Sequence, residues 1–314
     1  MTDARPKECN KRSVLLHSPN EASDQVPHGQ DEHAVVPPQA DTDEQLLSLW
    51  LHGRAEGTQA VYRAEAERML RYIGKSLHRI TLGDLQAFAD HLVQKGLADT
   101  TRHRILAITK SLIAFSHRLG YLPFDVARPL NLPPVRNRLS ERIIDEAQVQ
   151  RMIALEAHPR NRALLLLLYA AGVRVSESAS LTWRDCHQRD GGGQISVLGK
   201  GGKVRSIRLP GQVWQALQGL DNDADLNAPV FTSRNSGQLS RSQILRIVRR
   251  AANRACINKP VSPHWLRHAH ASHSLDRSAP IHLVQRTLGH ASVATTGRYL
   301  HARPSESSSD YLTL

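Results

Sequence analysis

Between residues 43 and 125 the apolar side chains recur at intervals of three and four positions. The pattern runs through four stretches, TDEQLLSLWL, TQAVYRAEAERMLRYI, TLGDLQAFADHLVQKG and TTRHRILAITKSLIAFSHRLG. This spacing places the apolar residues on one face of a helix. Several stretches also open on Thr, whose side chain can cap a helix N-terminus. The sequence therefore predicts a small helical domain over residues 43–126.

A second region of regular pattern begins near Asp145. NRALLLLLYAAG predicts an apolar helix that Gly172 ends. The runs GQISVL and KVRSIRLP then alternate apolar and polar residues around GKGG, which predicts a β-hairpin with Lys200 in its tip. SRSQILRIVRRAANRA returns to helical spacing. The expected fold class is mainly α with a small β-hairpin or sheet.

The remaining segments lack such periods. Residues 1–42 mix Pro, Ser, Asp and Gln without apolar periodicity, which is typical of a disordered tail. ARPLNLPPVRNRLSE carries three prolines and three arginines and predicts a basic linker over residues 127–139. A second domain is then expected over residues 140–301, followed by a polar tail at 302–314.

The charge of the chain points to a polyanionic partner. Lys and Arg number 41 against 29 Asp and Glu, a formal net charge of +12. The excess lies outside residues 1–42, which contain more acidic than basic side chains. Aromatic residues make up only 4% of the chain, which is poor material for stacking unpaired bases. Duplex DNA held through its phosphates is therefore the expected partner.

Cysteine content and hydropathy restrict the environment of the protein. The three cysteines, Cys9, Cys186 and Cys256, are too scattered for a disulfide framework or a zinc knuckle. No apolar run approaches a membrane span, and the polar start MTDARPKECNKR lacks the apolar stretch of a signal peptide. A cytoplasmic protein without a membrane partner is expected.

One predicted helix is strongly basic. Its arginines have no acidic residue among them and are Arg241, Arg246, Arg249, Arg250 and Arg254. A solvated helix face and a DNA-contacting face both fit this run.

Histidines crowd the C-terminal part of the chain, in VSPHWLRHAHASHS and LGHASVATTGRYLH. Ser262 and Pro263 are suited to begin a helix, which places His264 and Arg267 on one face near a helix end that attracts anions. His264 and His268 have the spacing of some zinc sites, but Trp265 stands where such sites need Glu. A phosphate site is favoured, with no metal and no cofactor.

The order of these features resembles the tyrosine recombinase (phage integrase) family, and within it the Xer-like members. AGVRVSE, GKGGKVRSIRLP, HWLRHAHASH and LGHASVATTGRYLH carry the resemblance, and residues 43–125 look like the core-binding domain of that family. The resemblance implies an enzyme that cleaves and rejoins duplex DNA as a tetramer, through a 3′-phosphotyrosine.

The resemblance also assigns roles. Arg174 and Arg267 would bind the phosphate, Lys200 would be the hairpin lysine, and Tyr299 would be the nucleophile. His264 and His290 match the two histidine positions of the family. Glu177 matches an acidic residue that supports the first arginine. Lys203 competes with Lys200 for the hairpin role, and Gly297 predicts a weakened helix just before the nucleophile.

Three other functions stay open on sequence alone. A DNA-binding protein of the same fold could lack catalysis, although the catalytic set is complete. A type IB topoisomerase shares the chemistry but acts alone on one duplex. The least favoured is a zinc hydrolase. For the end of the chain, SESSSDYLTL fits either a frayed terminus or, as in resembling recombinases, a segment that docks on a neighbouring protomer.

Overall fold

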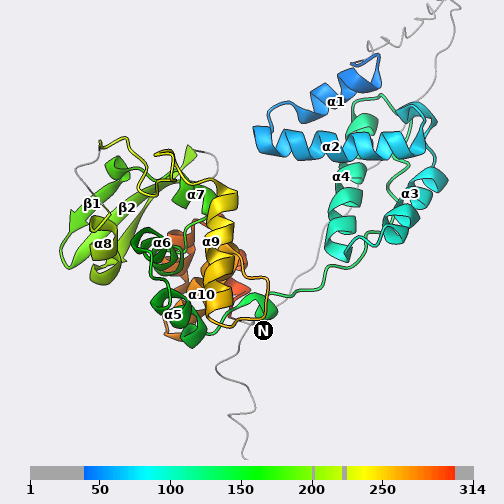
Figure 1. Cartoon of the computed structure of the whole chain (residues 1–314). Helices are drawn as coiled ribbons and strands as arrows, with labels where there is room; N and C mark the ends of the chain where they lie inside the picture. Colours follow the sequence, from blue (N-terminus) through cyan, green and yellow to red (C-terminus); the bar gives the residue numbers. More distant parts are fainter. Residues whose placement is uncertain (1–38, 200–201, 221–224, 301–314) are drawn as a thin grey trace, which may run out of the picture. The chain divides into compact units, whose positions relative to one another are not determined.

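Residues 39–199, 202–220 and 225–300 are described by a computed structural model (Figure 1). The chain divides into two units, with the boundary between Val135 and Arg136. Both units are built mainly from helices, and the second also holds a three-stranded sheet. This confirms the predicted fold class. Lys200 and the predicted C-terminal tail lie outside the described residues, as does most of the predicted N-terminal tail.

The described part of the N-terminal unit contains α1 (Asp43–Leu51), α2 (Glu56–Ile73), α3 (Leu82–Gln94) and α4 (Asp99–Arg118), with a 3₁₀ turn at Leu77–Arg79. Thr42 caps α1 by accepting a hydrogen bond from the Gln45 backbone, and Thr81 forms a capping box with Asp84 at the start of α3. The other two helices start after an alanine, so the threonines of those stretches lie inside the helix.

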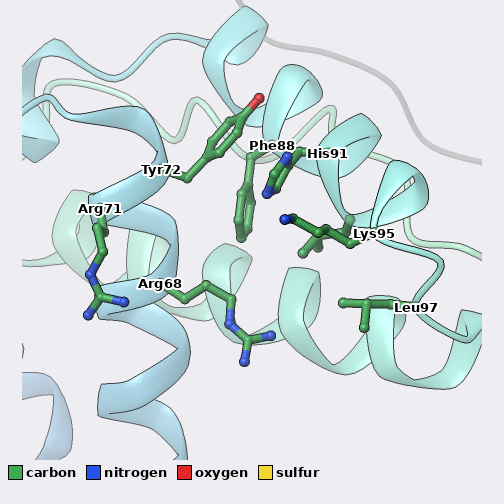
Figure 2. Close-up of a pocket in the computed structure, with 8 residues that line it drawn as sticks. Arg68, Arg71, Tyr72, Phe88, His91, Lys95 and Leu97 are labelled. Carbon is green, nitrogen blue, oxygen red and sulfur yellow. The ribbon is translucent and has the colours of Figure 1, made fainter.

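One apolar core joins these helices. Its fully buried side chains include Leu46, Met69, Leu85, Phe88, Leu92, Ile105 and Leu112. Ala127 and Leu130 are buried in the same core, so packing continues into the segment predicted as a linker. A groove lies between α2 and α3, where Tyr72 packs on Phe88 and the basic side chains of Arg68, Arg71 and Lys95 surround it (Figure 2).

The C-terminal unit begins with a 3₁₀ turn at Ser140–Arg142, followed by α5 (Glu146–Ala154), α6 (Pro159–Ala170) and α7 (Val175–Ala179). The residues of α6 from Ala163 to Leu168 are apolar on every face of the helix, which predicts that this part is buried on all sides. Residues 163–168 are all buried, and α6 packs against α5, α8 (Gly211–Gln218) and α10 (Pro263–Asp276). This helix therefore lies at the centre of the apolar core of the unit.

The sheet is antiparallel, in the order β1-β2-β3. The predicted hairpin is β2 (Gly192–Leu198) paired with β3 (Val204–Pro210), with Ile195 opposite Ile207. A 3₁₀ turn at Trp183–Asp185 leads into β1 (Cys186–Arg189), an edge strand of mostly exposed polar residues. Because β1 has no apolar alternation, the sequence did not predict it.

The described part of the unit also contains α9 (Arg241–Arg254), α11 (Ile281–Leu288) and α12 (Val293–Gly297). The predicted helix weakness near Gly297 has a structural counterpart, because α12 is short and ends at that glycine. Among the described residues, no helix is both long enough and apolar enough to span a membrane.

Candidate active site

The C-terminal end of α11 gathers three arginines. Arg205 Nε donates to the Thr287 carbonyl at 2.8 Å, an Nη atom of Arg267 donates to the Leu288 carbonyl, and an Nη atom of Arg174 lies 3.3 Å from the Gly289 carbonyl. The last carbonyls of a helix have no partner within the helix and form the negative end of its dipole. Three successive carbonyls therefore hold guanidiniums that come from β3, α10 and the start of α7.

Two glycines allow this close approach. Gly289 adopts a left-handed conformation at φ +64°, and a Cβ there would lie 3.2 Å from the Arg205 side chain. Gly172 has φ +57°, and a Cβ there would lie 2.7 Å from Leu288. The Gly172 carbonyl also accepts a hydrogen bond from Arg267. The glycines of AGVR and LGH thus serve both backbone conformation and the seating of arginines.

Glu177 links two of the three arginines. Its carboxylate accepts hydrogen bonds from Arg174 Nη1 at 2.7 Å and from both Nη atoms of Arg205 at 2.9 and 2.7 Å. The backbone N–H of Arg174 adds a fourth bond at 2.7 Å. Burial alone would raise the pKa of Glu177, but the hydrogen bonds from Arg205 and Arg174 outweigh it and lower the pKa to about 2. The carboxylate is ionised and fixes both guanidiniums.

Arg267 is the most deeply placed cation of the site, with only 3% of its surface exposed. Burial and then the charge of Arg174 lower its pKa to about 10, so it stays protonated near neutral pH. Two of its five N–H donors are taken by the carbonyls of Gly172 and Leu288. These two bonds fix the plane of the guanidinium and leave three N–H donors for other acceptors.

The histidines of the site are neutral near pH 7. Burial, followed by the charges of Arg267 and Arg174, lowers the pKa of His290 to about 4. The same causes lower the pKa of His264, which keeps an exposed face at the start of α10. His290 Nδ1 lies 2.9 Å from the Thr296 hydroxyl, and this bond orients the ring toward the short helix α12. A neutral imidazole in this position can donate one hydrogen bond and accept another.

Tyr299 follows α12 and is only 5% exposed. Its ring is parallel to that of His290, with the ring centres 6.4 Å apart. Its hydroxyl lies 2.8 Å from Nδ1 of His268. Burial raises the pKa of Tyr299, and the positive charges of Arg267 and Arg298 oppose that rise. The phenol is therefore neutral and lies within the electric field of the arginine cluster.

The hairpin lysines are only partly described. Lys200 lies outside the described residues. Lys203 has an exposed side chain, and its carbonyl accepts a 2.8 Å hydrogen bond from Gly199. The structure thus places Lys203 beside the hairpin tip.

The predicted basic helix is α9, which Ser240 caps through a capping box with Gln243. All five predicted arginines have exposed side chains. Arg254 pairs with the buried Glu156, which the sequence could not show because Glu156 belongs to another segment. Arg246 and Arg250 line a groove together with Arg160 and Arg234.

Two residues of the site were not singled out from the sequence. Arg205 occupies a half-buried position on β3. The one sequence signal that it points inward is its position two residues before Ile207, which places both side chains on the same face of the strand. His268 was considered only as a partner of His264 in a metal site. In the structure the two imidazole rings stack with their centres 6.0 Å apart, and His268 contacts Tyr299 instead.

The chain matches two family models, the phage integrase family over residues 142–306 and the phage integrase N-terminal SAM-like domain over residues 46–120. Tyrosine recombinase XerD of Vibrio cholerae serotype O1 is 30% identical over 288 residues, which cover 85% of this chain and 93% of the relative.

Two solved structures share the fold at 17% sequence identity. A lambda integrase dimer bound to a COC′ core site has a TM-score of 0.69, with 85% of this chain and 79% of that chain covered. A lambda integrase tetramer bound to a Holliday junction has a TM-score of 0.68, with 84% and 78% covered. With its family models, its relative and an arginine–tyrosine site in the matched region, the chain belongs to the phage integrase family, the tyrosine recombinases.

Proposed function

We propose that this chain is a site-specific DNA recombinase whose nucleophile is Tyr299. The observation that carries the proposal is the convergence of Tyr299, His290, Arg174 and Arg267 on the C-terminal end of α11. Oriented guanidinium donors next to a phenol suit attack on a phosphodiester, because they bind the charge that grows on the phosphate oxygens.

The reaction forms a bond between the Tyr299 oxygen and phosphorus and breaks the bond to the 5′ oxygen. The products are a 3′-phosphotyrosine and a free 5′-hydroxyl, so the energy of the phosphodiester is kept for rejoining. Arg174 and Arg267 bind the non-bridging oxygens, with Glu177 holding Arg174 in place. His290 donates a hydrogen bond to the phosphate, and His264 assists proton movement. Lys200 on the hairpin protonates the leaving oxygen, with Lys203 as the alternative.

DNA binding is assigned to two parts of the chain. Residues 43–126 act as the core-binding domain, and residues 140–301 form the catalytic domain. The exposed arginines of α9 contact phosphates, in particular Arg246 and Arg250, which line one groove. The similarity of the fold to a lambda integrase tetramer bound to a Holliday junction supports the assembly of four protomers on two duplexes. The protein acts in the cytoplasm, where DNA and reduced cysteines are found together.

The test uses a pool of nicked duplexes with a randomised central segment. Wild-type protein should capture a subset of the pool as a covalent adduct, and the recovered sequence is the selected duplex. Tyr299→Phe should bind the selected duplex and form no adduct, whereas Tyr169→Phe, which changes a tyrosine of the core helix α6, should still form it. An adduct that survives Tyr299→Phe would overturn the proposal.

The same duplex distinguishes a recombinase from the two alternative functions. A catalytically silent DNA-binding protein would enrich sequences without any covalent product. A topoisomerase-like enzyme would form the adduct as a monomer and relax supercoils without joining two duplexes. A recombinase joins strands from two copies of the selected duplex, which gives a product of new length on a gel.

A further inference from the structure

The Tyr299 hydroxyl has a defined partner in the active site. Across residues 39–199, 202–220 and 225–300, the side-chain hydrogen bond found for this hydroxyl is the one to His268 Nδ1, at 2.8 Å. His264, the histidine that the family resemblance selects, contacts His268 by stacking and has no such bond to Tyr299 within these residues. When the proton of the His268 ring lies on Nε2, Nδ1 accepts a hydrogen bond from the Tyr299 hydroxyl, and the phenolic proton has a direct path to His268 during attack.

The surroundings of His268 keep its lone pair available. Burial lowers its pKa to about 4, with further lowering by the charged groups that face it. The titratable groups that lower it further are His264 and Arg267 on α10, Arg142 on the 3₁₀ turn before α5, and Arg298 at the end of α12. An imidazole that is neutral near pH 7 can accept a proton, which an imidazolium cannot.

We propose that His268 is the general base of strand cleavage, accepting the phenolic proton of Tyr299 on Nδ1 as the phenol attacks phosphorus. This proposal rests on the proposed function, with Tyr299 as nucleophile. In cleavage the O–H bond of Tyr299 breaks and its proton moves to His268, while the Tyr299–phosphorus bond forms. The bond to the 5′ oxygen breaks at the same time, and that oxygen takes a proton from the hairpin lysine to become the 5′-hydroxyl. In rejoining, the imidazolium of His268 returns the proton to the departing tyrosine oxygen, as microscopic reversibility requires.

Substrate binding tunes this base. Without DNA, the arginines around the site disfavour a charged imidazole. A phosphate bound by Arg174 and Arg267 brings negative charge next to His268 and opposes those arginines, so the pKa of His268 rises when the reacting group is in place. The pair is thus inert in the free protein and becomes able to transfer a proton on the enzyme–DNA complex.

The test compares two substitutions on the full chain, with single-turnover cleavage of the selected duplex as the measurement. His268→Asn keeps a hydrogen-bonding group near the Nδ1 position but cannot accept a proton, so cleavage near pH 7 should slow by about 10²-fold or more. Its rate should then rise about tenfold per pH unit, because the phenol must ionise without a base. His268→Phe should be at least as slow. His282→Asn on the exposed face of α11 is the matched control and should cleave like wild type.

Three results would overturn the proposal. His268→Asn could cleave within about threefold of wild type while His268→Phe is slow, in which case His268 only positions the tyrosine. Both variants could cleave at the wild-type rate or faster, which would mean that the hydrogen bond only restrains Tyr299 and takes no part in proton transfer. The pH dependence of His268→Asn could also run parallel to that of wild type.

A second measurement needs no DNA and no folded His268 variant. In ¹⁵N-histidine NMR spectra of the full chain, Tyr299→Phe should shift the Nδ1 resonance of His268 and leave that of the partly buried His270, which bonds to the Tyr169 carbonyl, in place. An unchanged His268 resonance would exclude the hydrogen bond and with it the proposal. If wild-type protein forms no adduct with any duplex, the proposed function fails, whereas an adduct formed equally by His268→Asn refutes only the role of His268.

Discussion

Within the described residues, each unit has one buried glutamate that two arginines share, and the two glutamates differ in how their arginines are held. Glu65 of α2 pairs with Arg68 at 3.3 Å and with Arg104 of α4 at 2.8 Å, and each of those arginine side chains is 48% exposed. Glu177 pairs with Arg174 and Arg205, whose side chains are 31% and 11% exposed. In the first case both arginines are about half exposed, and in the second Arg174 is partly buried and Arg205 is mostly buried.

This difference separates arginines that can reorient in solvent from arginines whose donors are held in fixed positions. Around Glu65, Arg104 links α4 to α2, whereas Arg68 lies on α2 itself, and both arginine side chains are about half exposed. Around Glu177, both arginines also bind carbonyls at the end of α11, so their positions are set twice. Oriented donors need little reorganisation when an anion arrives, and such preorganisation makes the second arrangement useful for catalysis.

The largest expected effect comes from the most buried cation. Arg267→Lys should lower the single-turnover cleavage rate by at least about 10²–10³-fold, because an ammonium cannot bind the Gly172 and Leu288 carbonyls and a phosphate in one planar arrangement. Affinity for the selected duplex should change much less. Arg104→Lys is the matched control, since that arginine is half exposed and contacts Glu65 only at one carboxylate oxygen. Equal cleavage by Arg267→Lys and wild type would remove Arg267 from the clamp.

Glu177→Gln should show the next largest effect, on stability as well as on rate. Removing the carboxylate leaves two guanidiniums without their partner, which costs about 3–5 kcal/mol of unfolding free energy for a buried pair. Glu65→Gln should cost about 1 kcal/mol or less, because water can take over for half-exposed arginines. Chemical denaturation of both variants measures the two costs. Similar costs would mean that the two glutamates are equivalent.

The pH dependence of that difference has a defined sign. The pKa of Glu177 is lowered from 4.5 to about 2 in the folded chain, so its stabilising contribution is fully present above pH 4.5 and is lost as pH falls through about 2. The unfolding free energies of wild type and Glu177→Gln should therefore converge over this interval. A difference that stays constant from neutral pH to about 2 would show that the carboxylate charge is not its source.

Parts of this site could be predicted from sequence and parts could not. Helix positions followed from apolar spacing, and Arg174, Arg267 and Tyr299 followed from the family order of motifs. Arg205 was missed because alternation along β3 shows which face a side chain takes but not that it meets a carbonyl 82 positions later. Likewise, nothing near Arg254 in sequence indicates Glu156, which precedes it by 98 positions. Pairings across such separations depend on the packed fold.

Glycine substitutions should separate backbone strain from crowding. Gly74 ends α2 at φ +67°, and a Cβ added there would meet no atom within 4 Å, so Gly74→Ala should cost about 1 kcal/mol from its backbone conformation alone. Gly289→Ala meets the same conformational cost and also displaces Arg205, so it should cost more and slow cleavage. Gly297→Ala, with an open position and no positive φ, should be neutral or slightly stabilising. Thermal unfolding of the three variants should give this order. Equal losses of stability for Gly74→Ala and Gly289→Ala would mean that the Arg205 side chain moves away from the added Cβ without a loss of free energy.

The smallest effect is expected at the groove of the N-terminal unit, where the cations are exposed (Figure 2). Replacing Arg68, Arg71 and Lys95 together by Gln should leave the unfolding free energy nearly unchanged, because the three side chains are exposed and the buried Glu65 keeps its shorter ion pair with Arg104. If they bind DNA phosphates, the slope of log affinity against log salt should become shallower by about 0.9 for each phosphate that is no longer neutralised. Cleavage of bound duplex should proceed at the wild-type rate, since the α11 carbonyls bind Arg174, Arg205 and Arg267 and not these three residues. An unchanged salt slope would assign the phosphate contacts of this unit to other residues, and a slowed cleavage step would show that the groove does more than bind.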